Sequence, residues 1–144
     1  MDPHLEEALH RLEKAYFSFD KQQTPDGKNF GNWIVIGTRE HLAVRVTSDR
    51  GDILLDLMPR ERFTAGPNES DWYNWDVVAR ALGIDIFPEE DALRSFFDHS
   101  WMIDEAFSPY RWDKTAAMLS AVEQEKRRRF MEGPRVPPRV PVHQ

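Results

Sequence analysis

The residues that could carry out chemistry are few, and the most suggestive of them form a cluster between positions 98 and 105. The cluster consists of Asp98, His99, Asp104 and Glu105. On adjacent turns of a helix, a carboxylate and an imidazole could hold a metal ion or transfer a proton. The same spacing is common on solvated helix faces, so we expect a structural role, and a small hydrolase using this cluster is the weakest of three hypotheses.

Elsewhere the chain contains no recognised catalytic motif. It has no Gly-x-Gly-x-x-Gly, no Walker-type loop, no His-Glu-x-x-His and no Gly-x-Ser-x-Gly elbow. It has no cysteine, which excludes disulfides, thiolate metal sites and cysteine nucleophiles. Asp49 and Arg50 lie in a predicted turn, and a structural role in that turn explains them better than a catalytic role does. The sequence therefore predicts a non-enzymatic protein with no catalytic residue, no metal site and no cofactor.

Three short apolar runs form the centre of the chain, at residues 31–37, 41–47 and 52–58. The last two alternate with period two, which is typical of strands with one buried face. A turn at residues 48–51 places three apolar pairs opposite each other: Val46 with Ile53, Val44 with Leu55, and Leu42 with Leu57. We predict an antiparallel three-stranded meander with one apolar face, and Arg45 close to an aspartate on the other face.

Helical patterns flank the meander on both sides. The expected helices span residues 3–19, 71–82, a segment from Pro88 with a break near His99, and 108–131. Residues 59–69 are expected to form a long connection. Tyr16 belongs to the inward stripe of the first helix, and Trp72 and Trp75 are expected in the core. The predicted class is α+β, in the order α-β-β-β-α-α-α.

A change in composition near position 133 divides the chain. We expect a single α+β domain over residues 1–132 and a flexible, Pro- and Arg-rich tail over residues 133–144. The tail contains a near-duplicated Pro-Arg-Val-Pro unit. Four prolines in eight residues favour a polyproline conformation, which aromatic-lined grooves recognise. The second hypothesis is therefore an adaptor or scaffold that acts through this tail.

The net charge of −6 is concentrated in the middle of the chain. Residues 52–113 carry 5 basic and 14 acidic side chains, a net charge of −9. Such a surface repels phosphate backbones, which argues against nucleic acid, and it attracts a basic partner. The start lacks the order of a secretory signal, and no run approaches the roughly 20 apolar residues of a membrane span. We expect a soluble, cytoplasmic protein that contacts no membrane.

Several motifs occur together within residues 5–83. They are a leading helix, Leu-Ala-Val-Arg-Val at 42–46, Ser-Asp-Arg-Gly at 48–51, and a helix opening with Asp71-Trp72 and ending Ala81-Leu82-Gly83. In this order the chain is similar to small α+β immunity proteins that bacteria encode beside polymorphic toxins. The resemblance implies a protein that binds one cognate toxin tightly and blocks it, which is the leading hypothesis. Such pairs commonly join an acidic inhibitor to a basic toxin, and a nuclease is one candidate class.

Electrostatics, rather than the resemblance, selects the residues expected to bind this partner. Carboxylates around an aromatic anchor can each contribute to a charge-complementary interface. Trp101 or Tyr110 is the expected anchor. The full set of predicted partner-binding residues is Asp85, Glu89, Glu90, Asp91, Trp101, Asp104, Glu105 and Tyr110.

Overall fold

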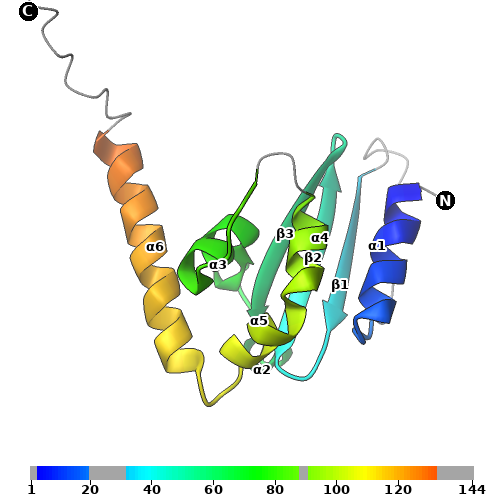
Figure 1. Ribbon diagram of the computed structural model, residues 1–144, viewed down its shortest axis with the longest axis horizontal. Helices are drawn as coiled ribbons and strands as arrows, with labels where there is room; N and C mark the ends of the chain where they lie inside the picture. Colours follow the sequence, from blue (N-terminus) through cyan, green and yellow to red (C-terminus); the bar gives the residue numbers. More distant parts are fainter. Residues whose placement is uncertain (1–2, 20–31, 88–90, 133–144) are drawn as a thin grey trace, which may run out of the picture.

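The computed structural model describes residues 3–19, 32–87 and 91–132. The predicted tail at 133–144, the helix start at Pro88, and Glu89 and Glu90 lie outside the described residues. The predicted α+β class is confirmed, with a helix first, an antiparallel sheet next and further helices after it (Figure 1). The elements are α1 (Pro3–Lys14), β1 (Trp33–Thr38), β2 (Leu42–Asp49), β3 (Asp52–Pro59), α2 (Arg60–Thr64), η1 (Glu69–Asp71), β4 (Tyr73–Asn74), α3 (Trp75–Leu82), α4 (Ala92–Asp98), α5 (Ser100–Ala106) and α6 (Trp112–Glu132).

The β2–β3 hairpin forms as predicted, but its register differs from the prediction by two residues. The structure pairs Leu42 with Pro59, Val44 with Leu57 and Val46 with Leu55. The turn contains only Arg50 and Gly51, whose φ angles of 54° and 87° are both positive. Such a type I′ turn matches the twist of the flanking strands better than a four-residue loop. A shift of two residues keeps every side chain on its face, so the predicted apolar face is right although the pairs are wrong.

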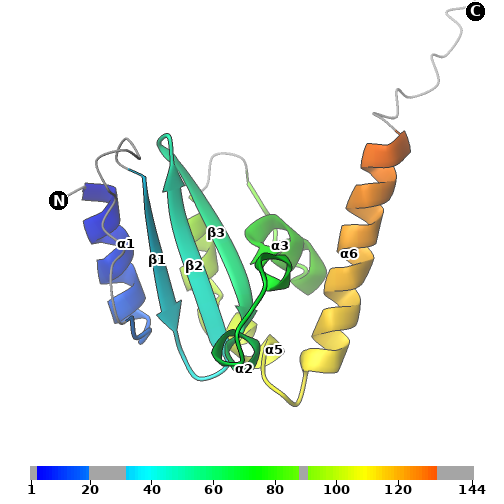
Figure 2. The same ribbon diagram turned by 180° about the vertical axis from the view of Figure 1, so that it is seen from behind.

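One face of the sheet carries the core. Its strand residues are Trp33, Val35, Val44, Val46, Leu55 and Leu57, all buried. Helices α4 and α5 cross in front of this face in Figure 1, with α1 beside β1 and α6 on the far side of α3. Seen from behind in Figure 2, the other face has one described helix over it, α2, at the end where Ala43 and Met58 are buried.

The first helix ends earlier than predicted. It stops at Lys14, and Tyr16 adopts a left-handed conformation with φ of 66°. The chain then turns so that Phe17 enters the core, with its N–H donating to the Leu12 carbonyl at 2.9 Å. Phe17 can approach β1 because Gly37 has no side chain: a Cβ there would lie 3.3 Å from the Phe17 Cβ. The inward position predicted for Tyr16 is wrong, because this residue is 74% exposed.

Three further elements refine the predicted order. The expected connection at 59–69 contains α2 and the start of η1, and Tyr73–Asn74 pairs with β3 as a short fourth strand. As a result α3 begins at Trp75 instead of Asp71, with the Asn74 side chain accepting the Asp76 N–H at 3.1 Å as the N-cap. Trp75 is buried as predicted, whereas Trp72 is only half-buried. The predicted break near His99 is confirmed, since it separates α4 from α5.

The two-residue turn makes a direct prediction about stability. Gly51→Ala forces a left-handed φ on a residue with a side chain, while no atom lies within 4 Å of the new Cβ. Backbone strain alone should therefore lower the free energy of unfolding of this variant by about 1–2 kcal/mol, measured by chemical denaturation. Arg50→Asn is the matched control in the same turn and should keep or raise stability, because asparagine tolerates this conformation. Equal stability of Gly51→Ala and the parent chain would contradict a type I′ turn.

Candidate functional site

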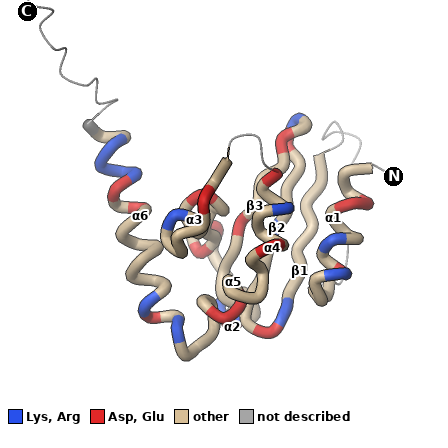
Figure 3. The backbone as a smooth tube through the Cα atoms, in the orientation of Figure 1, with Lys and Arg blue, Asp and Glu red and all other residues tan. Residues whose placement is uncertain are grey.

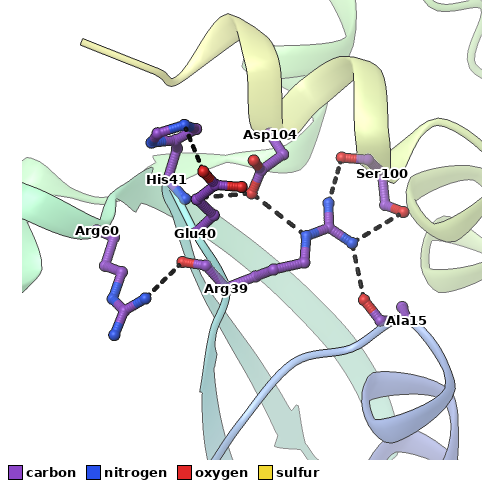
Figure 4. A network of polar contacts seen from close by, with 7 residues as sticks. All are labelled: Ala15, Arg39, Glu40, His41, Arg60, Ser100 and Asp104. Atoms are coloured by element: carbon purple, nitrogen blue, oxygen red, sulfur yellow. Dashed lines mark hydrogen bonds and ion pairs between the residues drawn. The ribbon is translucent and has the colours of Figure 1, made fainter.

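A buried ion pair connects α5 to the turn between β1 and β2. The Arg39 Nε lies 3.3 Å from the Asp104 Oδ1, and the two side chains are only 4% and 6% exposed (Figure 4). The same carboxylate oxygen lies 3.4 Å from the backbone nitrogen of His41, whose N–H it accepts. These contacts join residues more than 60 positions apart and place the start of β2 against α5.

The remaining donors of the Arg39 guanidinium bind the ends of two helices. Nη1 donates to the Ala15 carbonyl at 2.8 Å, just after α1, and Nη2 donates to the Ser100 carbonyl at 2.6 Å, at the start of α5. Burial lowers the pKa of this guanidinium, and the Asp104 carboxylate opposes that shift. An arginine keeps its proton in proteins, so the group stays cationic and fixes three segments together.

Two aromatic rings lie over this guanidinium, the buried Phe17 and the exposed Trp101. The Arg39 Cζ is 4.0 Å from the Trp101 ring centroid and 4.5 Å from that of Phe17. Tyr16 packs against Trp101 at 6.1 Å between centroids, although Trp101 is 59% exposed. Glu105 lies one turn from Trp101 on α5. Met102, which follows Trp101 in the sequence, is also exposed. Tyr16, Trp101, Met102 and Glu105 are called the aromatic surface below.

The predicted partner-binding residues differ in their exposure to solvent. Trp101, Tyr110, Asp85 and Glu105 are exposed as a binding role requires. Asp91 is half exposed and has internal roles, capping α4 through Leu93 N–H and pairing with Arg11 at 3.4 Å. Asp104 is wrong as a partner-binding residue, because its carboxylate is buried against Arg39. Glu89 and Glu90 lie outside the described residues.

A signal for the burial of Asp104 is present in the sequence. Asp104 follows Ser100 by four residues and precedes Phe107 by three, so it shares their helical face. Both of those residues are buried. A carboxylate on an inward face requires a buried cation as its partner. The sequence therefore indicates that Asp104 has such a partner, but it does not indicate that the partner is Arg39. Tyr16, Arg39 and Met102 are the candidates at this surface that sequence reasoning missed.

The predicted hydrolase cluster is not assembled. The His99 Nδ1 lies 2.8 Å from the Ser95 carbonyl, and Asp104 turns inward to Arg39. Among the described residues, one group of three offers ligand atoms within 4.8 Å of one another: Glu40, His41 and Asp104. The Arg39 guanidinium already neutralises Asp104, so its positive charge opposes a metal cation at this position.

A second arginine organises the opposite face of the sheet. Arg45 pairs with Asp56 at 3.0 Å, as predicted for an aspartate near this residue, and both side chains are mostly buried. Glu69 binds the same guanidinium through both oxygens at 2.8 Å, and the Trp72 ring lies 4.6 Å from the Arg45 Cζ. Hydrogen bonds from Arg45 lower the pKa of the Glu69 carboxyl. This group is satisfied internally and holds η1 against the sheet.

Comparison with protein-family models, curated proteins and solved structures gives no match for this chain. Within the described segments, every helix is too short or too polar to pass through a lipid bilayer. The geometry and charge of the surfaces are therefore the features that bear on function.

Replacing Arg39 should be severely destabilising. Arg39→Met leaves the Asp104 carboxylate buried without its cation, which should lower the free energy of unfolding by about 3–5 kcal/mol in chemical denaturation. The double variant Arg39→Met/Asp104→Leu should recover most of this loss, because an apolar pair removes the uncompensated charge. The control is Arg11→Met, whose ion pairs with Glu7 and Asp91 are solvent-exposed and should contribute less than about 1 kcal/mol. An Arg39 variant no less stable than the Arg11 variant would contradict a buried pair.

The Arg45 group predicts a pH dependence. Because the folded pKa of Glu69 lies below its usual value of 4.5, this carboxylate stabilises the fold above that pH and loses its contribution as the pH falls through the folded pKa. Glu69→Gln should therefore be less stable than the parent above pH 5, by at most about 1 kcal/mol because the group is exposed, and the difference should shrink in acid. Glu61→Gln, which removes an exposed glutamate with no ion pair among the described residues, is the control for the loss of one negative charge.

Proposed function

We propose that this chain is an immunity protein, which binds one cognate bacterial toxin in the cytoplasm of the producing cell and blocks it. The observation that carries the proposal is the aromatic surface: Trp101 and Tyr16 are exposed, yet each is held by contacts beneath or beside it. A non-enzymatic inhibitor needs a surface of this kind, and it acts only by occupying its target.

The rigidity of this surface supports tight binding. Interface energy concentrates in a few Trp, Tyr and Arg residues near the centre of the contact. Binding also costs free energy for each flexible side chain that becomes ordered. Ordering Trp101 on binding costs less free energy, because Arg39 and Tyr16 already restrict its ring. An exposed tryptophan with a fixed orientation is therefore a suitable anchor.

The charge around the anchor favours a basic partner. Asp98 at the end of α4 and Glu105 on α5 are exposed close to Trp101 in the sequence, and Glu105 also forms a solvent-exposed ion pair with Arg111 at 3.4 Å. Figure 3 shows acidic positions on α4 and α5 in this part of the molecule. Negative charge beside an aromatic anchor speeds the encounter with a positively charged toxin and disfavours partners of the same sign.

The proposal is tested by co-expressing this chain with the toxin encoded by the neighbouring gene. The parent chain should form a complex with that toxin and protect the cells. Trp101→Ala should weaken the complex at least about 30-fold, the effect of losing a hot spot of about 2 kcal/mol. Phe130→Ala is the control, because Phe130 is equally aromatic and 86% exposed but lies at the far end of α6. Failure of the parent chain to bind or protect would overturn the proposal.

Two further variants separate the alternatives. Glu105→Lys reverses a charge on the aromatic surface without changing the ring, so it should slow association and make it less sensitive to salt. Removal of residues 133–144 should leave protection intact if the folded body binds the toxin. Loss of activity on that removal would instead support an adaptor that acts through its Pro-rich tail.

A further inference from the structure

A second surface, separate from the aromatic surface, is a groove of about 950 Å³ between α2 and the start of α6. Three aromatic rings contribute to its lining: Tyr73, Phe107 and Trp112. Trp112 meets Tyr73 edge-on at 6.1 Å and Phe107 at 5.3 Å between centroids, so the three rings form one continuous cluster. Burial raises the pKa of the Tyr73 phenol, which keeps it neutral. Trp101 does not line this groove.

The charged residues of the groove leave an excess of negative charge. Four carboxylates line it, those of Glu40, Glu61, Asp71 and Asp113, against two arginines, Arg60 and Arg62. Both arginines are engaged: Arg62 pairs with Asp71 at 3.3 Å, and the Arg60 Nη1 donates to the Arg39 carbonyl at 3.3 Å. Within the described residues, Glu61 and Asp113 have no ion pair, and Glu40 meets only His41, at 3.6 Å.

We propose that this groove binds an arginine side chain presented by a basic, extended segment of a protein partner. A guanidinium is planar, so it can stack on an aromatic ring while it donates two hydrogen bonds to a carboxylate. Aromatic rings beside unpaired carboxylates supply both kinds of contact here. The volume is at the upper end of the range for small-ligand sites, which leaves room for residues on either side of the arginine.

This inference does not depend on the toxin proposal. The aromatic surface and the groove have different tryptophans, Trp101 and Trp112, and each can be replaced without the other. The groove is tested with a short synthetic peptide, so a negative result there leaves the co-expression experiment unaffected. Equally, a toxin that does not bind this chain would leave the peptide result standing.

The test titrates the full chain with acetyl-Gly-Val-Arg-Val-Gly-amide and with the same peptide carrying citrulline in place of arginine. Citrulline keeps the shape of the side chain but has no charge. The arginine peptide should shift the NMR signal of the Trp112 indole N–H, and the citrulline peptide should bind at least about tenfold more weakly. Asp113→Asn and Glu61→Gln should each weaken arginine-peptide binding about threefold, as expected for partly exposed charge pairs. Glu13→Gln, which removes an exposed carboxylate on α1, should change it less than twofold.

Five results would overturn the proposal. Equal binding of the citrulline peptide, or no binding of the arginine peptide, would show that the groove does not select a guanidinium. Binding of methylguanidinium as tight as that of the peptide would show a site for a small cation instead of a protein segment. Equal weakening by Glu13→Gln would show a long-range effect of net charge. Tighter peptide binding by the full chain with Arg135→Gln and Arg139→Gln would show that this chain's own arginines are the occupant.

Discussion

The buried pair between Arg39 and Asp104 is the interaction on which the arrangement of the surfaces depends. Removing two charges from water costs several kcal/mol, and the mutual attraction offsets this only when the remaining donors and acceptors are also satisfied. Here the guanidinium also binds carbonyls after α1 and at the start of α5. The pair therefore defines how α1, α5 and the β1–β2 turn meet, more than it adds net stability.

Both candidate surfaces are built on the short turn at residues 39–41, which contains the arginine of this pair. Arg39 supports the Trp101 ring on one side, and its neighbours Glu40 and His41 line the groove on the other. The Arg39 carbonyl also holds Arg60 at the groove. A substitution at Arg39 would consequently disturb both surfaces at once. The two tryptophans are the positions at which the surfaces can be studied one at a time.

Sequence patterns predict the fold best where a repeating physical constraint acts on many residues. Period-two alternation identified the buried face of β2 and β3, because apolar residues recur at every second position several times along each strand. The turn length could not be derived in this way, since a shift of two residues leaves every side chain on its face. Tyr73–Asn74 is too short for any periodicity, so β4 and the later start of α3 appear only in the structure.

The site was predictable only in part for a related reason. Trp101 and Glu105 could be found from residue type and helical spacing, and the inward face shared by Ser100 and Phe107 predicts burial of Asp104 as well. Its cation, 65 positions away, has no local pattern that identifies it. The exposure of Tyr16 depends on a single left-handed residue, and periodicity alone extends the helix through it.

The order of strands in the sheet also affects how the chain folds. Neighbouring strands in the order β1-β2-β3-β4 are consecutive in the sequence, and the β1–β2 and β2–β3 pairings each close a short loop. Local pairing of this kind costs little chain entropy and favours rapid folding. Docking of α5 through Arg39 closes a far longer loop, so we expect the sheet to form before the helical layer acquires its final position.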